Sequence, residues 1–213
     1  PSEEFTITVS PTAQVEQVED IVVCNGDEVA EIVFATTSEN DIAYSWSIDT
    51  EIGTESLTGV GNIPLFEADN DTNDPVVATV TVTPSNDETD PSLTCEGSSI
   101  EFTITVNPTA QVDPVDSLDL CNGDTAVVDF TTSNGGVDSV TTYSWEITDG
   151  DSVFVGGALT GAGNINLPVI NETNADLVAT VTVTPTYTND GVDCTGPSEE
   201  FTITVSPTAQ VEQ

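Results

Sequence analysis

One stretch that occurs three times constrains the fold of this chain more than any other feature. Each copy reads Glu-Phe-Thr-Ile-Thr-Val, then Ser or Asn, then Pro-Thr-Ala-Gln-Val, and the copies lie at Glu4–Val15, Glu101–Val112 and Glu200–Val211. In addition, Pro1–Gln17 is identical to Pro197–Gln213. Self-similarity at a fixed period is the signature of repeat architectures. We therefore expect this sequence to be a window of a long tandem array whose unit is a pair of unlike modules.

The repeated stretch has the pattern of two strands joined at a proline. Phe5, Ile7 and Val9 alternate with threonines, and a period of two is typical of a half-buried strand. Pro11 lacks the N–H that a sheet ladder needs, so it should end the strand, although a single kinked strand is the alternative. The pattern predicts modules at 11–107 and 108–206, with 1–10 as the last strand of a preceding module and 207–213 as the first strand of a following one.

Within each module, apolar residues alternate over short runs that are separated by turn residues. Strands are predicted at Gln14–Val23, Glu28–Thr37, Ala43–Ile48 and Val76–Thr83, and no segment keeps a helical period. About seven short strands per module, with turns about every ten residues, predict an all-β chain of tandem immunoglobulin-like β-sandwich modules that form an extended fibre. Trp46 and Trp145 are expected in the core rather than at a ligand site.

The charged residues exclude several classes of function. The chain has 38 acidic residues and no Lys, Arg or His. Nucleic acids and anionic membrane surfaces both attract basic groups, so neither is expected as a partner. Without His, the usual general base is missing and Ser or Cys nucleophiles have no partner, so we predict that the modules are not an enzyme. No apolar run reaches the length of a membrane span.

A series of short motifs occurs in the same order in both modules. The motifs are Cys-Asn-Gly-Asp, Tyr-Ser-Trp, Leu-Thr-Gly-x-Gly-Asn-Ile, Ala-Thr-Val-Thr-Val-Thr-Pro, Cys-x-Gly and Phe-Thr-Ile-Thr-Val-x-Pro. As a set they resemble the PKD-like, immunoglobulin-type tandem repeats of giant Bacteroidota surface adhesins, including those used in gliding motility. This resemblance covers the whole chain. It implies a β-sandwich fold, export by the type IX system and an extracellular position at the cell surface, and it offers no catalytic residues.

Four cysteines at matching places in the two modules indicate disulfides and an oxidising compartment. Repeat logic pairs Cys24 with Cys95 and Cys121 with Cys194, each within one module. In an immunoglobulin-type sandwich, however, Cys24 should lie at the far end of its module and Cys95 at the near end, too far apart for a bond. That geometry favours Cys24 with Cys194 across the joint, with Cys95 and Cys121 bonded to modules outside this sequence. Both pairings remain open.

One acidic loop is a candidate cation site. Asp69, Asp71, Asn73 and Asp74 gather oxygen ligands of the kind that calcium prefers. The spacing is not that of an EF-hand, and the corresponding loop at Asn171–Asp176 has fewer carboxylates. A solvated turn is the alternative. Calcium is the one cofactor for which the sequence gives any indication.

Short acceptor patterns indicate glycosylation. By analogy with the family, O-glycans would be attached where Asp is followed by Ser or Thr and then by an apolar residue. Four positions fit this pattern, namely Ser117, Thr125, Ser139 and Ser152. A pattern this short also arises by chance in a Thr-rich acidic chain.

The preferred interpretation is a structural repeat that forms the rigid shaft of a secreted adhesin filament. Its partners would be neighbouring modules of the same chain, an anchoring machinery at the cell surface, and an adhesion ligand bound outside this sequence. Two alternatives remain, namely a spacer or accessory stalk in a secreted hydrolase and a sheath or surface layer whose chains are bridged by cations.

Overall fold

The computed structural model describes residues 3–5, 12–37, 42–86, 95–150, 153 and 159–209. The chain divides into two compact units. The first comprises Pro1–Asp71 and Val76–Val106, and the second comprises Thr72–Pro75 and Asn107–Gln213. Both units are built from β-strands, as the sequence predicted.

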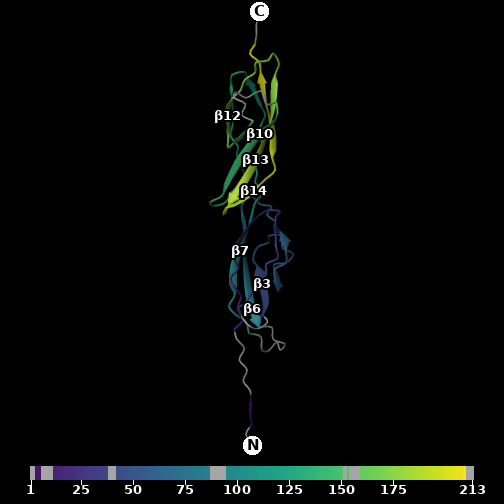
Figure 1. Cartoon of the computed structure of the whole chain (residues 1–213), viewed down its shortest axis with the longest axis vertical. Helices are drawn as coiled ribbons and strands as arrows, with labels where there is room; N and C mark the ends of the chain where they lie inside the picture. Colours follow the sequence, from purple (N-terminus) through teal and green to yellow (C-terminus); the bar gives the residue numbers. More distant parts are fainter. Residues whose placement is uncertain are drawn as a thin grey trace, which may run out of the picture. The chain divides into compact units, whose positions relative to one another are not determined.

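The first unit is a β-sandwich of one large and one small sheet (Figure 1). The small sheet pairs β2 (Glu28–Val29) with β5 (Phe66–Glu67) antiparallel, and a bridge between Ile32 and Ile63 continues this pairing. The large sheet has the order β1-β7-β6-β3-β4, and its strands are β1 (Ile21–Cys24), β3 (Ile42–Ile48), β4 (Thr58–Val60), β6 (Val76–Asn86) and β7 (Ile100–Asn107).

The second unit repeats this plan. Its large sheet has the order β11-β10-β13-β15-β8, with β14 paired to β13, and β8 runs parallel to β15. The small sheet pairs β9 (Thr125–Val128) with β12 (Ile165–Pro168). The strands of the large sheet are β8 (Leu118–Cys121), β10 (Val140–Asp149), β11 (Thr160–Ala162), β13 (Leu177–Asn189), β14 (Val192–Thr195) and β15 (Glu199–Ser206). Tandem immunoglobulin-like β-sandwich modules are therefore confirmed as the fold.

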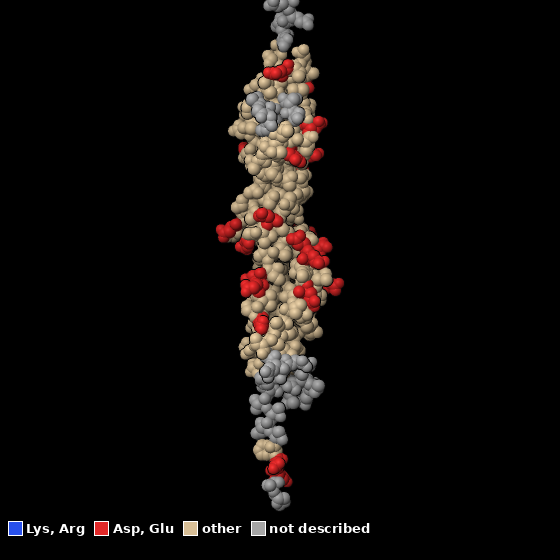
Figure 2. Space-filling view, in the orientation of Figure 1, with Lys and Arg blue, Asp and Glu red and all other residues tan. Residues whose placement is uncertain are grey.

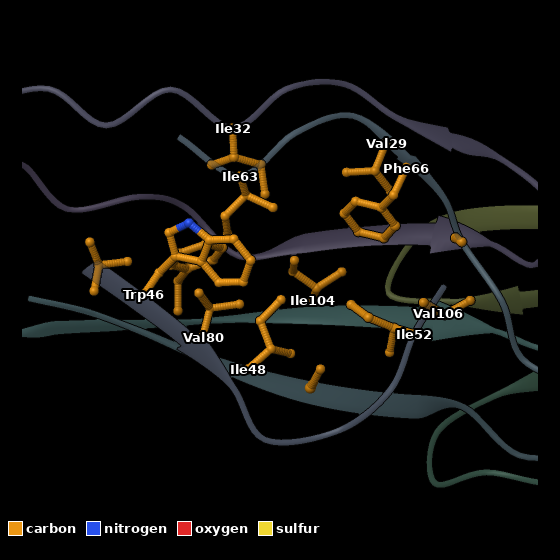
Figure 3. Close-up of a cluster of buried hydrophobic side chains, with 14 of the residues drawn as sticks. Val29, Ile32, Trp46, Ile48, Ile52, Ile63, Phe66, Val80, Ile104 and Val106 are labelled. Atoms are coloured by element: carbon orange, nitrogen blue, oxygen red, sulfur yellow. The ribbon is translucent and has the colours of Figure 1, made fainter. Parts of the chain in front are cut away.

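Alternation along the central strands places one face of each large sheet in the core. In β6, Ala78, Val80 and Val82 are fully buried, whereas the threonines between them lie on the outer face. The pattern recurs in β13. Figure 3 shows Trp46 among aliphatic side chains that include Val80 and Ile63. Both Trp46 and Trp145 are buried, which confirms their expected place in the core.

The prolines of the repeated stretch end strands, as predicted. β7 stops at Asn107, directly before Pro108, and β15 stops at Ser206, directly before Pro207. The first copy, at Pro11, lies outside the described residues.

Two predicted strands are wrong over most of their length. Of Gln14–Val23, only the last residues belong to β1; before it, the Gln17 amide donates to the Glu101 carbonyl at 2.9 Å. Of Glu28–Thr37, only the first two residues belong to β2, and the Phe34 N–H donates to the Asn62 side chain at 3.2 Å. In both segments, side-chain bonds and isolated backbone bonds, such as Glu16 N to the Ala35 carbonyl at 2.9 Å, take the place of a regular ladder, and a hydrophobic pattern does not reveal them.

Pro84 and Pro185 lie inside β6 and β13, where a proline is unexpected. The Pro84 carbonyl accepts from Gly97 N at 2.8 Å, and the Pro185 carbonyl accepts from Gly196 N at 3.1 Å. The nitrogen of a strand residue faces the same side as its carbonyl, and β7 begins only at Ile100. The N–H that each proline lacks would therefore point toward a part of the neighbouring chain that does not form a complete backbone ladder with the strand.

Candidate functional site

The Cys-Asn-Gly-Asp motif forms the same tight turn in both modules. The Asp27 carboxylate accepts from Cys24 N at 3.2 Å, and the Asp124 carboxylate accepts from Cys121 N at 2.8 Å. Gly26 has a φ of 84°, a conformation that glycine adopts without steric cost. Side chains of Asp commonly bond to nearby backbone in this way, which accounts for the order of residues in the motif.

Two asparagines that follow β5 and β12 are buried, and sequence reasoning missed their role. Asn70 and Asn171 are 4% and 2% exposed. The Asn70 amide donates to the Val106 carbonyl at 2.8 Å, and the Asn171 amide donates to the Val205 carbonyl at 2.6 Å. Each therefore ties a loop to the end of the last strand of its module. The signal that could have revealed them is their identity at matching positions in both modules.

The asparagine of Cys-Asn-Gly-Asp holds the same buried residue. The Asn25 side-chain oxygen accepts from Asn70 N at 2.8 Å, and the Asn122 side-chain oxygen accepts from Asn171 N at 2.8 Å. The motif turn, the buried asparagine and the last strand thus form one hydrogen-bonded chain. This chain is present in both units.

The Gly-Asn-Ile motif has an equally local use. The Asn62 amide donates to Glu31 at 3.0 Å while its oxygen accepts from Phe34 N. In the second module, Asn164 donates to Asp129 at 2.7 Å and accepts from Phe130 N at 3.1 Å. These bonds hold the irregular segment that follows the second strand of each module.

The glycine of Leu-Thr-Gly lies directly over the core tryptophan. A Cβ atom added to Gly59 would overlap the Trp46 ring, and one added to Gly161 would overlap the Trp145 ring. Cross-strand pairing fixes this contact, because Trp46 is opposite Gly59 and Trp145 is opposite Gly161. The Tyr-Ser-Trp motif also supplies an aromatic pair, since the Phe34 and Tyr44 ring centroids are 5.5 Å apart.

The shifted pKa values belong to structural groups. The Thr103 N–H, at 2.6 Å, lowers the pKa of Asp20 below its ordinary 3.8, and the Thr79 N–H, at 2.8 Å, does the same for Asp49. Burial raises the pKa of Tyr44 above its ordinary 10.0. None of these shifts moves a group toward neutral pH, where a general acid or base would operate.

The predicted calcium ligands are divided between the two units. Asp69 and Asp71 belong to the first unit, whereas Asn73 and Asp74 belong to the second, where the Asn73 carbonyl accepts from Gly135 N at 2.9 Å. Across the described parts of the chain, no three acidic or thiol side chains are grouped to hold a metal ion. Calcium binding stays a prediction.

The predicted glycosylation sites differ in what their hydroxyls do. Ser117 is exposed and accepts from Thr202 N at 3.2 Å. Ser139 is half-buried and donates to the Gly135 carbonyl at 3.0 Å. Thr125 is exposed at the start of β9, and Ser152 lies outside the described residues. Modification at these positions stays a prediction.

The cysteines differ in state. Cys24 and Cys194 are each disulfide-bonded, whereas Cys121 is exposed and has a free thiol. Cys95 is also exposed. The chain thus contains a disulfide, as the sequence predicted.

Acidic side chains are spread over the surface without any basic side chain among them (Figure 2). The described part of the chain contains no helix with the length and apolar composition of a membrane span. The side chains of the repeated motifs therefore serve internal hydrogen bonds and core packing. The surface carries a negative electrostatic potential.

Comparison with known proteins agrees with this architecture. Residues 119–209 match the family model described as a PKD-like domain. No curated protein matches the chain. Solved structures similar to it include the human desmocollin-1 ectodomain (12% identity, 94% of this chain, 42% of that chain, TM-score 0.43) and Drosophila N-cadherin EC1-4 (15%, 93%, 50%, 0.41). The chain spans about half the length of these structures or less, and the likeness concerns the fold alone. Over residues 119–209, which make up most of the second module, the chain is thus similar to a PKD-like domain.

Proposed function

We propose that these modules are non-catalytic repeats in the shaft of a giant secreted adhesin, which extends from the cell surface and serves attachment or gliding. The observation that carries the proposal is the repetition itself, in which Pro1–Gln17 returns unchanged at Pro197–Gln213. In repeat proteins, length is gained by copying one unit that contacts its neighbours. The PKD-like match of the second module supports an extracellular repeat.

The fate of the motifs also supports a structural role. The positions that are identical in both modules serve turns, buried asparagine bonds and the contact between glycine and tryptophan. An enzyme would instead keep some repeated polar residues for a cleft. We therefore propose that adhesion ligands and the anchoring machinery bind elsewhere in the whole protein.

We further propose that Cys24 and Cys194 are bonded to each other and staple one module to the next. Both are disulfide-bonded, and Cys121, the partner that Cys194 would have within its own module, has a free thiol. By the same rule, Cys121 would bond to a module that follows. Such staples would stiffen the shaft.

Non-reducing peptide mapping tests the staple. Trypsin is useless because the chain has no Lys or Arg, so pepsin is the choice, and its acidic pH also prevents thiol exchange. We expect one linked pair of peptides that contains Cys24 and Cys194. Linkage of Cys24 to Cys95 would refute the staple and leave the adhesin proposal standing.

Electron microscopy of the intact protein from its source cells tests the shaft. We expect a thin fibre of uniform modules. A globular head on a short stalk would favour the secreted hydrolase instead. A sheet that comes apart when a chelator is added would favour the cation-bridged layer. Calorimetric titration of calcium tests the loop at Asp69–Asp74, and no heat at millimolar calcium would exclude that site.

A further inference from the structure

A small cavity in the first unit has two buried polar atoms in its wall that lack a partner. The cavity has a volume of about 130 Å³, and Trp46, Thr54, Ile63 and Phe66 are among its lining residues. The indole Nε1 of Trp46 and the hydroxyl of Thr54 are buried and make no hydrogen bond within the described part of the chain. Neither atom takes part in the motif bonds described above.

The Trp46 side chain is held in place, so its indole N–H cannot turn toward another acceptor. Its side chain is 7% exposed, and Gly59 closes off one side of its ring. In Figure 3 the indole nitrogen, drawn blue, lies on the side of the ring toward Ile32 and Ile63, away from Val80 and Ile48. An indole N–H is a donor with a fixed direction. Because buried donors are almost always paired, an acceptor from outside the chain would complete this site.

The wall of the cavity favours an organic molecule over water. Ile63, Pro64, Leu65 and Phe66 present mostly apolar surface. A space of this volume would hold about four waters, and each would need two or more polar partners. The polar part of the wall, in which Glu55, Ser56 and Thr58 lie beside the two unpaired atoms, is much smaller than the apolar part, so a full set of waters would be poorly bonded. A molecule with an apolar body and a single acceptor oxygen satisfies both the apolar wall and the two polar atoms.

The charge around the cavity further restricts the class of ligand. The acidic residue Glu55 also lines the cavity, and the chain has no Lys, Arg or His to neutralise an anion. Carboxylates, phosphates and sulfates are therefore repelled. An engineered apolar cavity of comparable size accepts benzene, which has six non-hydrogen atoms, so the ligand should have about six or seven.

We propose that this cavity binds a small neutral organic molecule whose oxygen accepts hydrogen bonds from Trp46 Nε1 and Thr54. The module would then carry a ligand in addition to its structural role. In the second unit, Trp145 Nε1 is likewise buried without a partner among the described residues. Most of the segment that corresponds to the wall around Thr54 lies outside those residues, and the proposed binding site is the cavity of the first unit.

The test follows the indole N–H signal of Trp46 in nitrogen-15 spectra of the whole chain. The chain has only two tryptophans, so the two indole signals are easily separated. Cyclohexanone is the probe, because it is neutral and has a carbonyl acceptor on a ring. Toluene has the same number of non-hydrogen atoms and no acceptor. We expect a saturable shift with cyclohexanone and binding about fivefold weaker with toluene.

Variants connect the shift to the cavity. Thr54→Val removes the hydroxyl at nearly constant shape and should weaken cyclohexanone binding about fivefold. Thr54→Leu adds volume and should abolish the binding. Thr81→Val, on the outer face of β6, is the control and should change nothing. Three outcomes would each overturn the proposal. The shift could grow in proportion to cyclohexanone concentration without saturating, or toluene could bind as tightly as cyclohexanone. The third is a Trp46 indole signal that exchanges with water and does not respond to either probe.

Discussion

The two modules differ at two places where a carboxylate of the first module accepts from a backbone N–H. In the first module, Thr103 N donates to the Asp20 carboxylate at 2.6 Å. At the same position in the second module, Thr202 N donates to the Ser117 hydroxyl at 3.2 Å. The site four residues before the Cys-Asn-Gly-Asp motif thus needs an acceptor, and the acceptor can be charged or neutral.

The second difference lies three residues after each tryptophan. Thr79 N donates to the Asp49 carboxylate at 2.8 Å in the first module. In the second module, Thr148 occupies the position of Asp49. Its hydroxyl is 3.5 Å from the Thr180 carbonyl, next to a register shift in β10. Here the exchange of a carboxylate for a hydroxyl accompanies a change in the strand itself.

Other positions allow no exchange at all. Gly59 and Gly161 face tryptophan rings, and Asn70 and Asn171 supply an amide to a buried strand end. At these places both modules use the same residue because only one side chain fits the geometry. The comparison therefore separates positions that use one residue type in both modules from the position of Asp20 and Ser117, which requires only a hydrogen-bond acceptor.

The largest effect is expected where glycine meets tryptophan. Gly59→Ala and Gly161→Ala should each lower the free energy of unfolding of their module by about 3 kcal/mol, because the added methyl overlaps a ring in a filled core. Urea unfolding followed by the two indole signals measures each module in the whole chain.

A nearby glycine in each module is the matched control. Gly61 and Gly163 have φ values of 75° and 70°, and a Cβ there meets nothing within 4 Å. Alanine at these positions should therefore cost only the backbone strain, about 1 kcal/mol. A loss at Gly61 as large as the loss at Gly59 would mean that the overlap with the ring does not explain the glycine at position 59.

The buried asparagines should come next. Asn70→Ala leaves the Val106 carbonyl without this donor, and Asn171→Ala does the same to the Val205 carbonyl. Loss of a hydrogen bond to a buried group costs about 2 kcal/mol, so each module should lose about that much in urea unfolding. Asn174→Ala, at an exposed position of the same loop, should change stability by less than about 0.5 kcal/mol. If Asn174 mattered as much as Asn171, the buried bond would not be the cause.

The sequence predicts the elements whose signal is local. Alternation located β3 and β6, proline located the end of β7, and the tryptophans were assigned to the core because they lie in a strand pattern. Each of these features depends on residues that are close together in the chain.

Features that depend on distant partners could not be predicted. Asn70 lies in an acidic stretch that resembles a cation loop, and nothing nearby shows that the Val106 carbonyl, 36 residues away, takes its amide. Similarly, Gln17 and Asp20 hold their segment through side-chain bonds to β7, so an apolar pattern alone predicted a strand that is formed only over its last residues. The unpaired indole N–H of Trp46 becomes visible only when the surrounding wall is known.

The smallest expected effect is a difference in acid sensitivity between the modules. Hydrogen bonds lower the folded pKa of Asp20 and Asp49 below 3.8, so each carboxylate adds stability that is present above that value. This stability is lost as the pH falls below 3.8 and through the lowered pKa. In the second module a hydroxyl occupies each of these positions, so it has no such contribution to lose there.

Protonation in acid also removes repulsion among the carboxylates, and this stabilises both modules. Substitutions separate the contribution of Asp20 and Asp49 from that general effect. In Asp20→Ser with Asp49→Thr, the first module should be less stable than the original at pH 7, and this difference should shrink as the pH falls below 3.8. Ser117→Asp should do the reverse and make the second module more sensitive to acid. Thermal unfolding between pH 7 and pH 2.5, followed by the indole signals, measures both. If the double variant kept the acid response of the original chain, Asp20 and Asp49 would serve only as acceptors, and their charge would contribute nothing to the difference between the modules.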